Sequence, residues 1–209
     1  MLIVGAKGLA KEVLEIFHQR NELKNLWFYD DISTDIPGKL FGIFPVIRNM
    51  QRVTEMFKTD NRFTLGIGGS QLRFKFSEMF KKAGGELASC ISPLVSIGHY
   101  GTTINNGTIV MAGTVITNDV HIGEGCIINP NCTISHDSHL GDFVEVSPGV
   151  QITGHCEIGS FCHIGTNATI LPKIKIGNNV TVGAGAVVTK DIYDGFTVAG
   201  VPAKRLVKK

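Results

Sequence analysis

The stretch ITNDVHIGEGCIINPNCTISHDSHL, residues 116–140, carries a branched apolar residue at every sixth position. The same spacing holds from Ile104 to Val188, with Ile, Leu or Val at each of the fifteen positions. Neither an α-helix nor an ordinary strand has a period of six. A solenoid does, because its short strands follow the sides of a prism and each hexad points one side chain inward. With three hexads per coil, the repeat predicts a left-handed parallel β-helix of five coils.

Glycine or asparagine often follows the inward residue of a hexad, as in Ile122-Gly123, Ile128-Asn129 and Leu140-Gly141. Both residue types tolerate the unusual backbone angles that a tight corner demands. We therefore expect these positions to form the corners of the prism. The repeat defines the fold more strongly than it defines any chemistry.

The composition favours a protein that neither binds nucleic acid nor enters a membrane. The 209 residues carry a net charge of +2 with no basic stripe, and no run of about 18 apolar residues occurs. Residues 1–4 lead into a strand-like segment without the basic region of a signal peptide, so we expect a cytoplasmic protein. The last six residues, 204–209, are locally basic. Such an end is more often a solvated terminus, although it could also contact cofactor phosphates.

Four of the five cysteines share one slot in the repeat, four residues after an inward residue. They are Cys126, Cys132, Cys156 and Cys162. The other residues in this slot are mainly small ones, Thr, Ser and Ala, and no Cys-x-x-Cys pair occurs. We therefore interpret these cysteines as small packing residues and expect neither a zinc site nor a disulfide framework.

The first ninety residues follow a different pattern, in which apolar strand-like segments alternate with amphipathic helical ones. Strands are expected at residues 2–5, 26–29, 63–67 and 86–91, and helices at residues 9–20, 48–58 and 71–83. This alternation predicts a small parallel sheet with helices on both faces. We place an α/β, Rossmann-like half domain at residues 1–92 and the β-helix with a C-terminal cap at residues 93–209.

The end of the first expected strand has features of a nucleotide site. Gly5 and Gly8 let a ligand approach the backbone, and the helix that follows presents an N-terminus that favours phosphate. Asp30 or Asp31, ending the second strand, could accept hydrogen bonds from a ribose or a base. A single nucleotide fits half of a doubly wound fold better than a dinucleotide. The alternative is a glycine turn that only allows the helix and sheet to pack.

The densest polar run of the solenoid is Ser135-His136-Asp137-Ser138-His139. A neutral imidazole can take a proton from an attacking amine or hydroxyl, and an adjacent carboxylate can fix its tautomer. This pair would suit direct acyl transfer from a thioester, with backbone N–H groups stabilising the oxyanion. The alternative for any such histidine is a polar residue at a corner, which we favour for His18 and His99. Residues 18 apart should lie above one another, and Asp137 and His155 therefore share a column.

Several segments together resemble bacterial nucleotide-sugar acetyltransferases. They are residues 1–15, the Asp30-Asp31 pair, residues 68–73, residues 129–148 and the repeat, and the most specific piece is INPNCTISHD at residues 128–137. This family includes sialic-acid O-acetyltransferase-like proteins and the N-acetyltransferases of bacillosamine and perosamine pathways. The resemblance implies a UDP- or GDP-linked amino sugar in the N-terminal domain. It also implies a homotrimer with acetyl-CoA in the groove between neighbouring subunits.

The resemblance also implies roles for individual residues. His136 would be the general base and Asp137 its carboxylate partner. The nucleotide sugar would lie beside Gly5, Lys7, Gly8, Asp30, Asp31, Gly68 and Arg73. The acetyl-CoA groove would be lined by Glu145, Gly154, Thr166, Gly183 and Ala184, with the Gly154 N–H near the thioester carbonyl.

Several positions depart from the family pattern. Leu9 replaces a common histidine, Lys7 in the opening motif could add a phosphate contact, and Glu145 stands where some members carry a second histidine. The turn at residues 68–70 lacks the asparagine pair of some members.

The predicted function is acetyl-CoA-dependent N-acetylation of a nucleotide-linked sugar, with a UDP-4-amino-4,6-dideoxy sugar as the preferred substrate, in bacterial glycan biosynthesis. No metal is expected. Three alternatives stay open. The first is O-acetylation of a sugar such as sialic acid. The second is a zinc hydratase resembling γ-class carbonic anhydrases, in which His121, His139 and His163 converge across a subunit interface to bind zinc, and against which the N-terminal domain argues. The third is a scaffold that binds a nucleotide sugar without turning it over.

Overall fold

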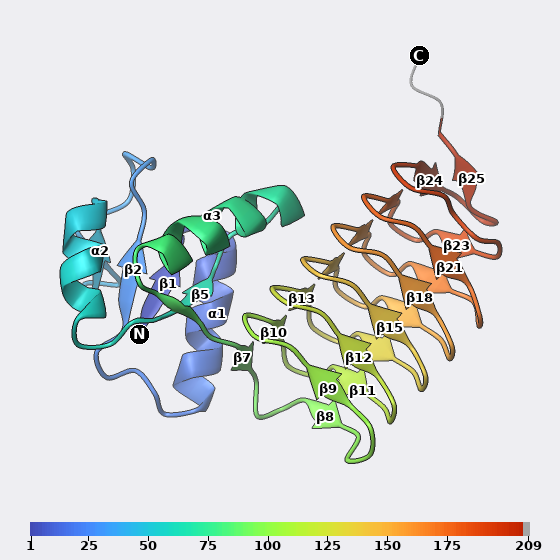
Figure 1. The fold of residues 1–209 in the computed structure, drawn as a ribbon, viewed down its shortest axis with the longest axis horizontal. Helices are drawn as coiled ribbons and strands as arrows, with labels where there is room; N and C mark the ends of the chain where they lie inside the picture. The colour runs from blue at the N-terminus through green and yellow to red at the C-terminus, as the bar shows by residue number, and fades with distance from the viewer. Residues whose placement is uncertain (207–209) are drawn as a thin grey trace. The chain divides into compact units, whose positions relative to one another are not determined.

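The computed structural model describes residues 1–206 and divides the chain into two compact units, Met1–Cys90 and Ile91–Lys209 (Figure 1). Within the predicted basic end, Lys204 and Arg205 form the last strand, β25 (Lys204–Arg205), and Val207, Lys208 and Lys209 lie outside the described residues. None of the helices in residues 1–206 has the length and apolar character needed to cross a membrane.

The first unit is a six-stranded sheet with the order β3-β4-β2-β1-β5-β6, parallel except for the β3–β4 pair. Its strands are β1 (Leu2–Val4), β2 (Trp27–Tyr29), β3 (Lys39–Leu40), β4 (Phe44–Ile47), β5 (Arg62–Leu65) and β6 (Glu86–Leu87), and its helices are α1 (Gly8–Gln19), α2 (Met50–Phe57) and α3 (Ser70–Lys82). Strands β1 and β5 are neighbours, and the connections that leave their carboxyl ends run to opposite sides, from β1 through α1 to β2 and from β5 through α3 to β6. Ligands of parallel α/β sheets bind at such a switch point.

Two features of this region differ from the sequence expectation. The β3–β4 hairpin was not expected. The single strand expected at residues 86–91 is wrong, because the chain changes sheets within it. Strand β6 pairs with β5 in the first unit, whereas β7 (Cys90–Ile91) is the end strand of a β-helix sheet, next to β10 (Ile109–Val110).

The second unit is the predicted left-handed β-helix, built from three sheets that form the sides of a prism (Figure 1). The five-stranded side contains β9 (Thr103–Ile104), β12 (His121–Ile122), β15 (His139–Leu140), β18 (Glu157–Ile158) and β21 (Lys175–Ile176). The six-stranded side contains β8 (Ser96–Ile97), β11 (Val115–Ile116), β14 (Thr133–Ile134), β17 (Gln151–Ile152), β20 (Thr169–Ile170) and β23 (Val187–Val188). The eight-stranded side contains β7, β10, β13 (Ile127–Ile128), β16 (Glu145–Val146), β19 (His163–Ile164), β22 (Thr181–Val182), β24 (Thr197–Ala199) and β25.

Stacked coils pair in parallel with a register of 18 residues, so that Ile116, Ile134 and Ile152 lie one above another. The inward residues form one continuous buried core, and these three side chains are at most 1% exposed. The hexad pattern therefore works as the sequence predicts, because each branched side chain packs on its equivalents in the coils above and below.

The corners of the prism lie three residues after each inward residue, not immediately after it as expected. Every sixth residue from Gly101 to Gly185 has a positive φ, whether it is glycine or not. Gly123, which directly follows an inward residue, does not. A Cβ on Gly123 would lie 2.5 Å from the carbonyl carbon of Gly141 in the next coil. Glycine at such a position therefore provides space between coils, and the expectation of a corner there is wrong.

All five cysteines are free and buried, in agreement with a packing role. In the shared slot, Cys126 Sγ lies 3.1 Å from the Gly141 oxygen and Cys162 Sγ lies 2.9 Å from the Gly177 oxygen. The hydroxyl of Ser138 donates in the same way, to the Thr153 oxygen at 3.0 Å. Where the slot holds cysteine or serine, the small side chain therefore packs in the core and also donates to a carbonyl oxygen of the neighbouring coil. Burial raises the pKa of Cys162 to about 11, so its thiol stays protonated at neutral pH.

Candidate active site

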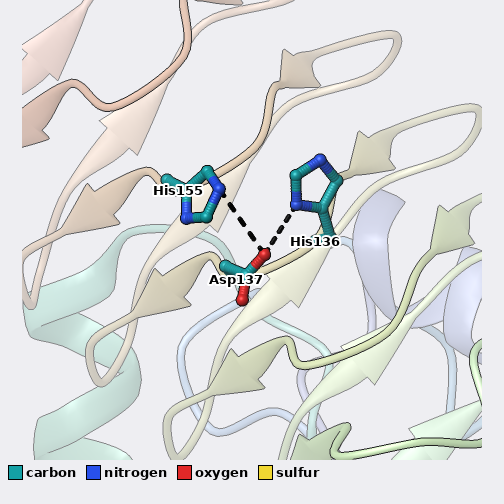
Figure 2. A group of neighbouring side chains, drawn as sticks. All are labelled: His136, Asp137 and His155. Carbon is teal, nitrogen blue, oxygen red and sulfur yellow. Dashed lines mark hydrogen bonds and ion pairs between the residues drawn. The ribbon is translucent and has the colours of Figure 1, made fainter.

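The candidate base is His136, in the corner between β14 and β15. Its Nδ1 lies 2.7 Å from Asp137 Oδ2. Figure 2 marks this contact with a dashed line. The two side chains are 60% and 46% exposed, so a substrate can reach them. The hydrogen bond with His136, followed by the charges of neighbouring histidines, holds the pKa of Asp137 below its ordinary value. An ionised carboxylate beside the ring is therefore the normal state of the site near neutral pH.

This contact fixes the tautomer of the His136 ring. An ionised carboxylate can only accept, so Nδ1 carries the proton and donates it to Asp137. Nε2 then has a free lone pair on the side of the ring away from the carboxylate (Figure 2). The ring can take up a proton at Nε2, and Asp137 stabilises the imidazolium that forms.

Gly154, which lies 18 residues after His136 in the next coil, packs directly against the His136 ring. A Cβ at residue 154 would lie 2.7 Å from His136 Cε1 and 2.8 Å from Nε2, closer than real side chains pack. The backbones of the two coils are joined here, because the His155 N–H donates to the His136 oxygen at 2.9 Å. Within residues 1–206, the Gly154 N–H has no hydrogen-bond acceptor. A donor without an acceptor therefore adjoins the candidate base.

His155 completes this cluster, although the sequence analysis gave it no role. Its ring meets that of His136 edge-on, with the centroids 5.1 Å apart, and its Nε2 lies 3.7 Å from Asp137 Oδ2. The 18-residue spacing between Asp137 and His155 was the available signal. Among residues 1–206, His136, Asp137 and His155 are the one group of three potential metal ligands with converging ligand atoms.

The three histidines of the zinc alternative do not gather within one chain. His121 and His139 stack with ring centroids 4.6 Å apart, and His121 Nδ1 lies 2.7 Å from Thr103 Oγ1. His163 lies on a different side of the prism, in β19, where its Nε2 lies 3.0 Å from Ser147 Oγ.

The residues predicted to line the acetyl-CoA groove fall into separate groups. Gly154 lies with His136 at the corner that follows the six-stranded side. Thr166 and Ala184 are one coil apart at the corner that follows the eight-stranded side, beside Gly183. The Gly185 N–H donates to the Thr166 oxygen at 2.8 Å, which joins these two coils. Glu145 lies on the eight-stranded side itself, in β16, opposite His163.

A pocket of about 390 Å³ opens in the first unit at the carboxyl ends of β1, β2 and β5. Its lining includes Gly5, Lys7, Gly8, Asp30, Asp31 and Gly68, together with the apolar residues Leu9, Ile32, Leu72 and Phe76. Six of the seven residues predicted to contact the nucleotide sugar thus lie around one pocket. The seventh, Arg73, lies in α3 with its side chain fully buried and does not line the pocket.

Polar contacts define the floor and rim of this pocket. Gly5 has a φ of +105°, and a Cβ there would lie 2.6 Å from the Gly66 oxygen, so only glycine fits. Asp30 Oδ1 accepts the backbone N–H of Ser33 at 2.8 Å. Burial, followed by a hydrogen bond to Asp31, raises the pKa of Tyr29. At the rim, Lys7 Nζ lies 3.2 Å from Asp35 Oδ1, with both side chains largely exposed.

Comparisons with known proteins match both units. The model of the PglD N-terminal domain matches residues 1–80, and that of the bacterial transferase hexapeptide (six repeats) matches residues 101–136, 137–172 and 155–190. A sequence comparison with curated proteins gave no match.

Solved structures match nearly the whole chain. The acetyltransferase domain of PglB from Neisseria gonorrhoeae FA1090, in complex with acetyl coenzyme A, is 32% identical with a TM-score of 0.90, and the match covers 98% of each chain. A mutant of perosamine N-acetyltransferase from Caulobacter crescentus, in complex with CoA and GDP-perosamine, is 28% identical with a TM-score of 0.91, covering 99% of this chain and 96% of that one. WeeI from Acinetobacter baumannii AYE is 29% identical with a TM-score of 0.90, covering 98% of each chain.

The extent of these matches defines the protein class. The PglB domain exceeds 30% identity over both units at once, so the likeness is not limited to the common β-helix. The chain belongs to the hexapeptide-repeat sugar acetyltransferases, as its sequence features predict.

The close contact between Gly154 and the His136 ring gives a test of the site geometry. In Gly154→Ala, the added methyl group should push the imidazole off its position and break the hydrogen bond to Asp137, while the coils stay stacked. A crystal structure of the variant checks this directly. Gly38→Ala, where a Cβ meets no atom within 4 Å, is the control and should leave the pair unchanged. An undisturbed His136–Asp137 pair in Gly154→Ala would contradict the inferred packing.

Proposed function

We propose that the chain is an acetyl-CoA-dependent N-acetyltransferase that acts on the amino group of a nucleotide-linked sugar in bacterial glycan biosynthesis. The observation that carries this proposal is the 2.7 Å contact between His136 Nδ1 and Asp137 Oδ2, which leaves Nε2 as an accessible base. The relatives support the substrate class, because one is described with CoA and GDP-perosamine and another with acetyl coenzyme A. The preferred substrate is a UDP-4-amino-4,6-dideoxy sugar.

In the proposed reaction the sugar amine attacks the thioester carbonyl while His136 Nε2 takes a proton from the nitrogen. Asp137 holds the ring and stabilises the imidazolium. The Gly154 N–H, which lacks an acceptor among residues 1–206, donates to the oxyanion of the tetrahedral intermediate. Collapse of the intermediate breaks the carbon–sulfur bond, and the imidazolium returns the proton to the departing thiolate of CoA. The amide is formed without an acyl-enzyme.

In the first unit, the pocket at the ends of β1, β2 and β5 would hold the nucleotide. The loop from Gly5 to Gly8 and the N-terminus of α1 would receive the diphosphate, because exposed N–H groups and the helix dipole favour negative charge. Asp30, Asp31 and Gly68 would contact the ribose and base. The side chain of Arg73, in α3, is buried and does not reach the pocket. Arg73 would therefore contribute to nucleotide binding only indirectly, by supporting α3.

We also propose a homotrimer with acetyl-CoA bound between neighbouring β-helices. The positions of the predicted groove residues support this, because Gly154 lies at one corner of the prism and the Thr166–Ala184 pair at another. A groove lined by both would be formed by two neighbouring chains, each of which contributes one of these corners. Glu145 would line the same groove.

Light scattering should give a mass three times that of the 22.6 kDa chain, and a monomer that turns over substrate would contradict this arrangement.

The decisive assay is release of CoA thiol by purified protein on a panel of UDP- and GDP-linked 4-amino sugars, with sialic acid included. We expect rapid release with one amino sugar and an N-acetyl product. The protein's own cysteines are buried and will contribute little to a thiol-reactive dye. Release with sialic acid alone would replace N-acetylation by O-acetylation, and no release across the panel would contradict the proposal.

The catalytic pair is tested in the same assay. His136→Ala should lower kcat by about 10²- to 10⁴-fold, the usual contribution of a general base. His99→Ala, which removes an exposed histidine near the start of the β-helix, is the control and should leave turnover unchanged. Unchanged turnover in His136→Ala would contradict the mechanism.

Lys7 provides a test of the phosphate site. In the unliganded chain its ammonium group contacts Asp35, and a diphosphate would compete for it. Lys7→Met should raise KM for the nucleotide sugar by about tenfold, the scale of a charge-assisted hydrogen bond partly screened by solvent, with KM for acetyl-CoA unchanged. Asp35→Asn releases Lys7 from its partner and should lower KM for the nucleotide sugar. Equal KM values in Lys7→Met and wild type would exclude a phosphate contact.

A further inference from the structure

The cluster of His136, Asp137 and His155 places three ligand atoms around a common point (Figure 2). His136 Nδ1 and His155 Nε2 lie 2.7 and 3.7 Å from the same atom, Asp137 Oδ2. Each of the three residues offers one ligand atom within 4.8 Å of those of the other two. We propose that this cluster binds a zinc ion and that the bound ion inhibits the enzyme. The inhibition rests on the proposed function, whereas the binding does not.

The spacing of the ligand atoms is close to what a zinc ion requires. Around a tetrahedral zinc ion with bonds of about 2.0–2.1 Å, neighbouring ligand atoms lie about 3.3–3.5 Å apart. The distance from His155 Nε2 to Asp137 Oδ2 is already 3.7 Å. The distance from His136 Nδ1 to Asp137 Oδ2 has to open from 2.7 Å as the ion replaces the proton between them.

The backbone holds the three ligands in place before any ion arrives. Asp137 and His155 occupy successive positions of the corner column, each with a φ of 59°. The His155 N–H donates to the His136 oxygen, and Gly154 supports the His136 ring. The three side chains are about half exposed, so an ion can enter and water can take the remaining coordination position.

The donor set determines which ions the cluster accepts. Two imidazoles and one carboxylate suit zinc and its neighbours among the transition metals, whereas magnesium and calcium prefer sites made of oxygen ligands. Magnesium is therefore a matched negative control in any titration.

Binding would disable the proposed base through its tautomer. A neutral imidazole has one nitrogen lone pair to share and one N–H. When Nδ1 of His136 binds the ion, the proton must lie on Nε2, which then cannot accept a proton from the substrate amine. The ion also takes Asp137 away from the ring, so the support for an imidazolium is lost as well.

Binding is measured on the full chain, freed of metal, by titration with zinc chloride against a chromophoric chelator. We expect one ion per chain, and we expect His155→Asn to weaken the affinity at least tenfold. Asparagine suits a corner with positive φ, as Asn131 and Asn167 show, so the variant should fold. His139→Asn is the matched control and should bind as wild type does. Equal affinity in His155→Asn and wild type, a comparable loss in His139→Asn, or no zinc binding would overturn the site.

Inhibition is measured separately, with the acetylated product quantified by chromatography because zinc binds the released thiol. Zinc should lower kcat of the wild type, magnesium should not, and a chelator should restore it. In His155→Asn, zinc should lower kcat by a much smaller factor than in the wild type, each measured against the same protein without zinc. Zinc binding without loss of kcat, or equal inhibition of His155→Asn, would overturn the inhibitory role. A wild type inactive without zinc would contradict the proposed function, while the binding titration would still decide the zinc site.

Discussion

The parallel pairing of coils with an 18-residue register is the constraint on which the rest of the β-helix depends. Each backbone hydrogen bond between coils fixes a residue over its equivalent one turn earlier, as in the bond from the His155 N–H to the His136 oxygen. A residue in this fold therefore has two sets of neighbours, those along the chain and those 18 positions away. The candidate site uses both, because His136 contacts Asp137 through the chain and Gly154 and His155 through the stack.

Close packing between coils explains how the candidate base can be held in one position on an exposed surface. Corners of a solenoid are exposed, and an exposed histidine in a loop would sample several rotamers. Here Gly154 packs against the His136 ring from the next coil, and Asp137 holds its Nδ1 through a hydrogen bond. The chemistry is therefore accessible to solvent, while its geometry is set by backbone that cannot move without breaking the ladder.

The sequence predicted the β-helix well because each hexad repeats one simple requirement, a branched side chain facing a shared core. It also predicted the family and the grouping of Gly5, Lys7 and Asp30 around one pocket. It placed the corners wrongly, since a glycine such as Gly123 serves packing between coils and its φ is not positive. It missed the β3–β4 hairpin, whose strand β3 has only two residues and leaves little periodic signal. It gave no role to His155, because a column shows that residues are stacked without showing where their side chains point.

The corner column has a consequence for how this fold can diversify. The column consists of residues 119, 137, 155 and 173, all of which have a positive φ, yet it holds two aspartates, a histidine and a lysine. Because the turn keeps its shape with such different occupants, a substitution there changes the surface chemistry and leaves the register of the coils alone. Related chains could therefore acquire new ligand-binding side chains at these positions, one residue at a time, on an unchanged backbone.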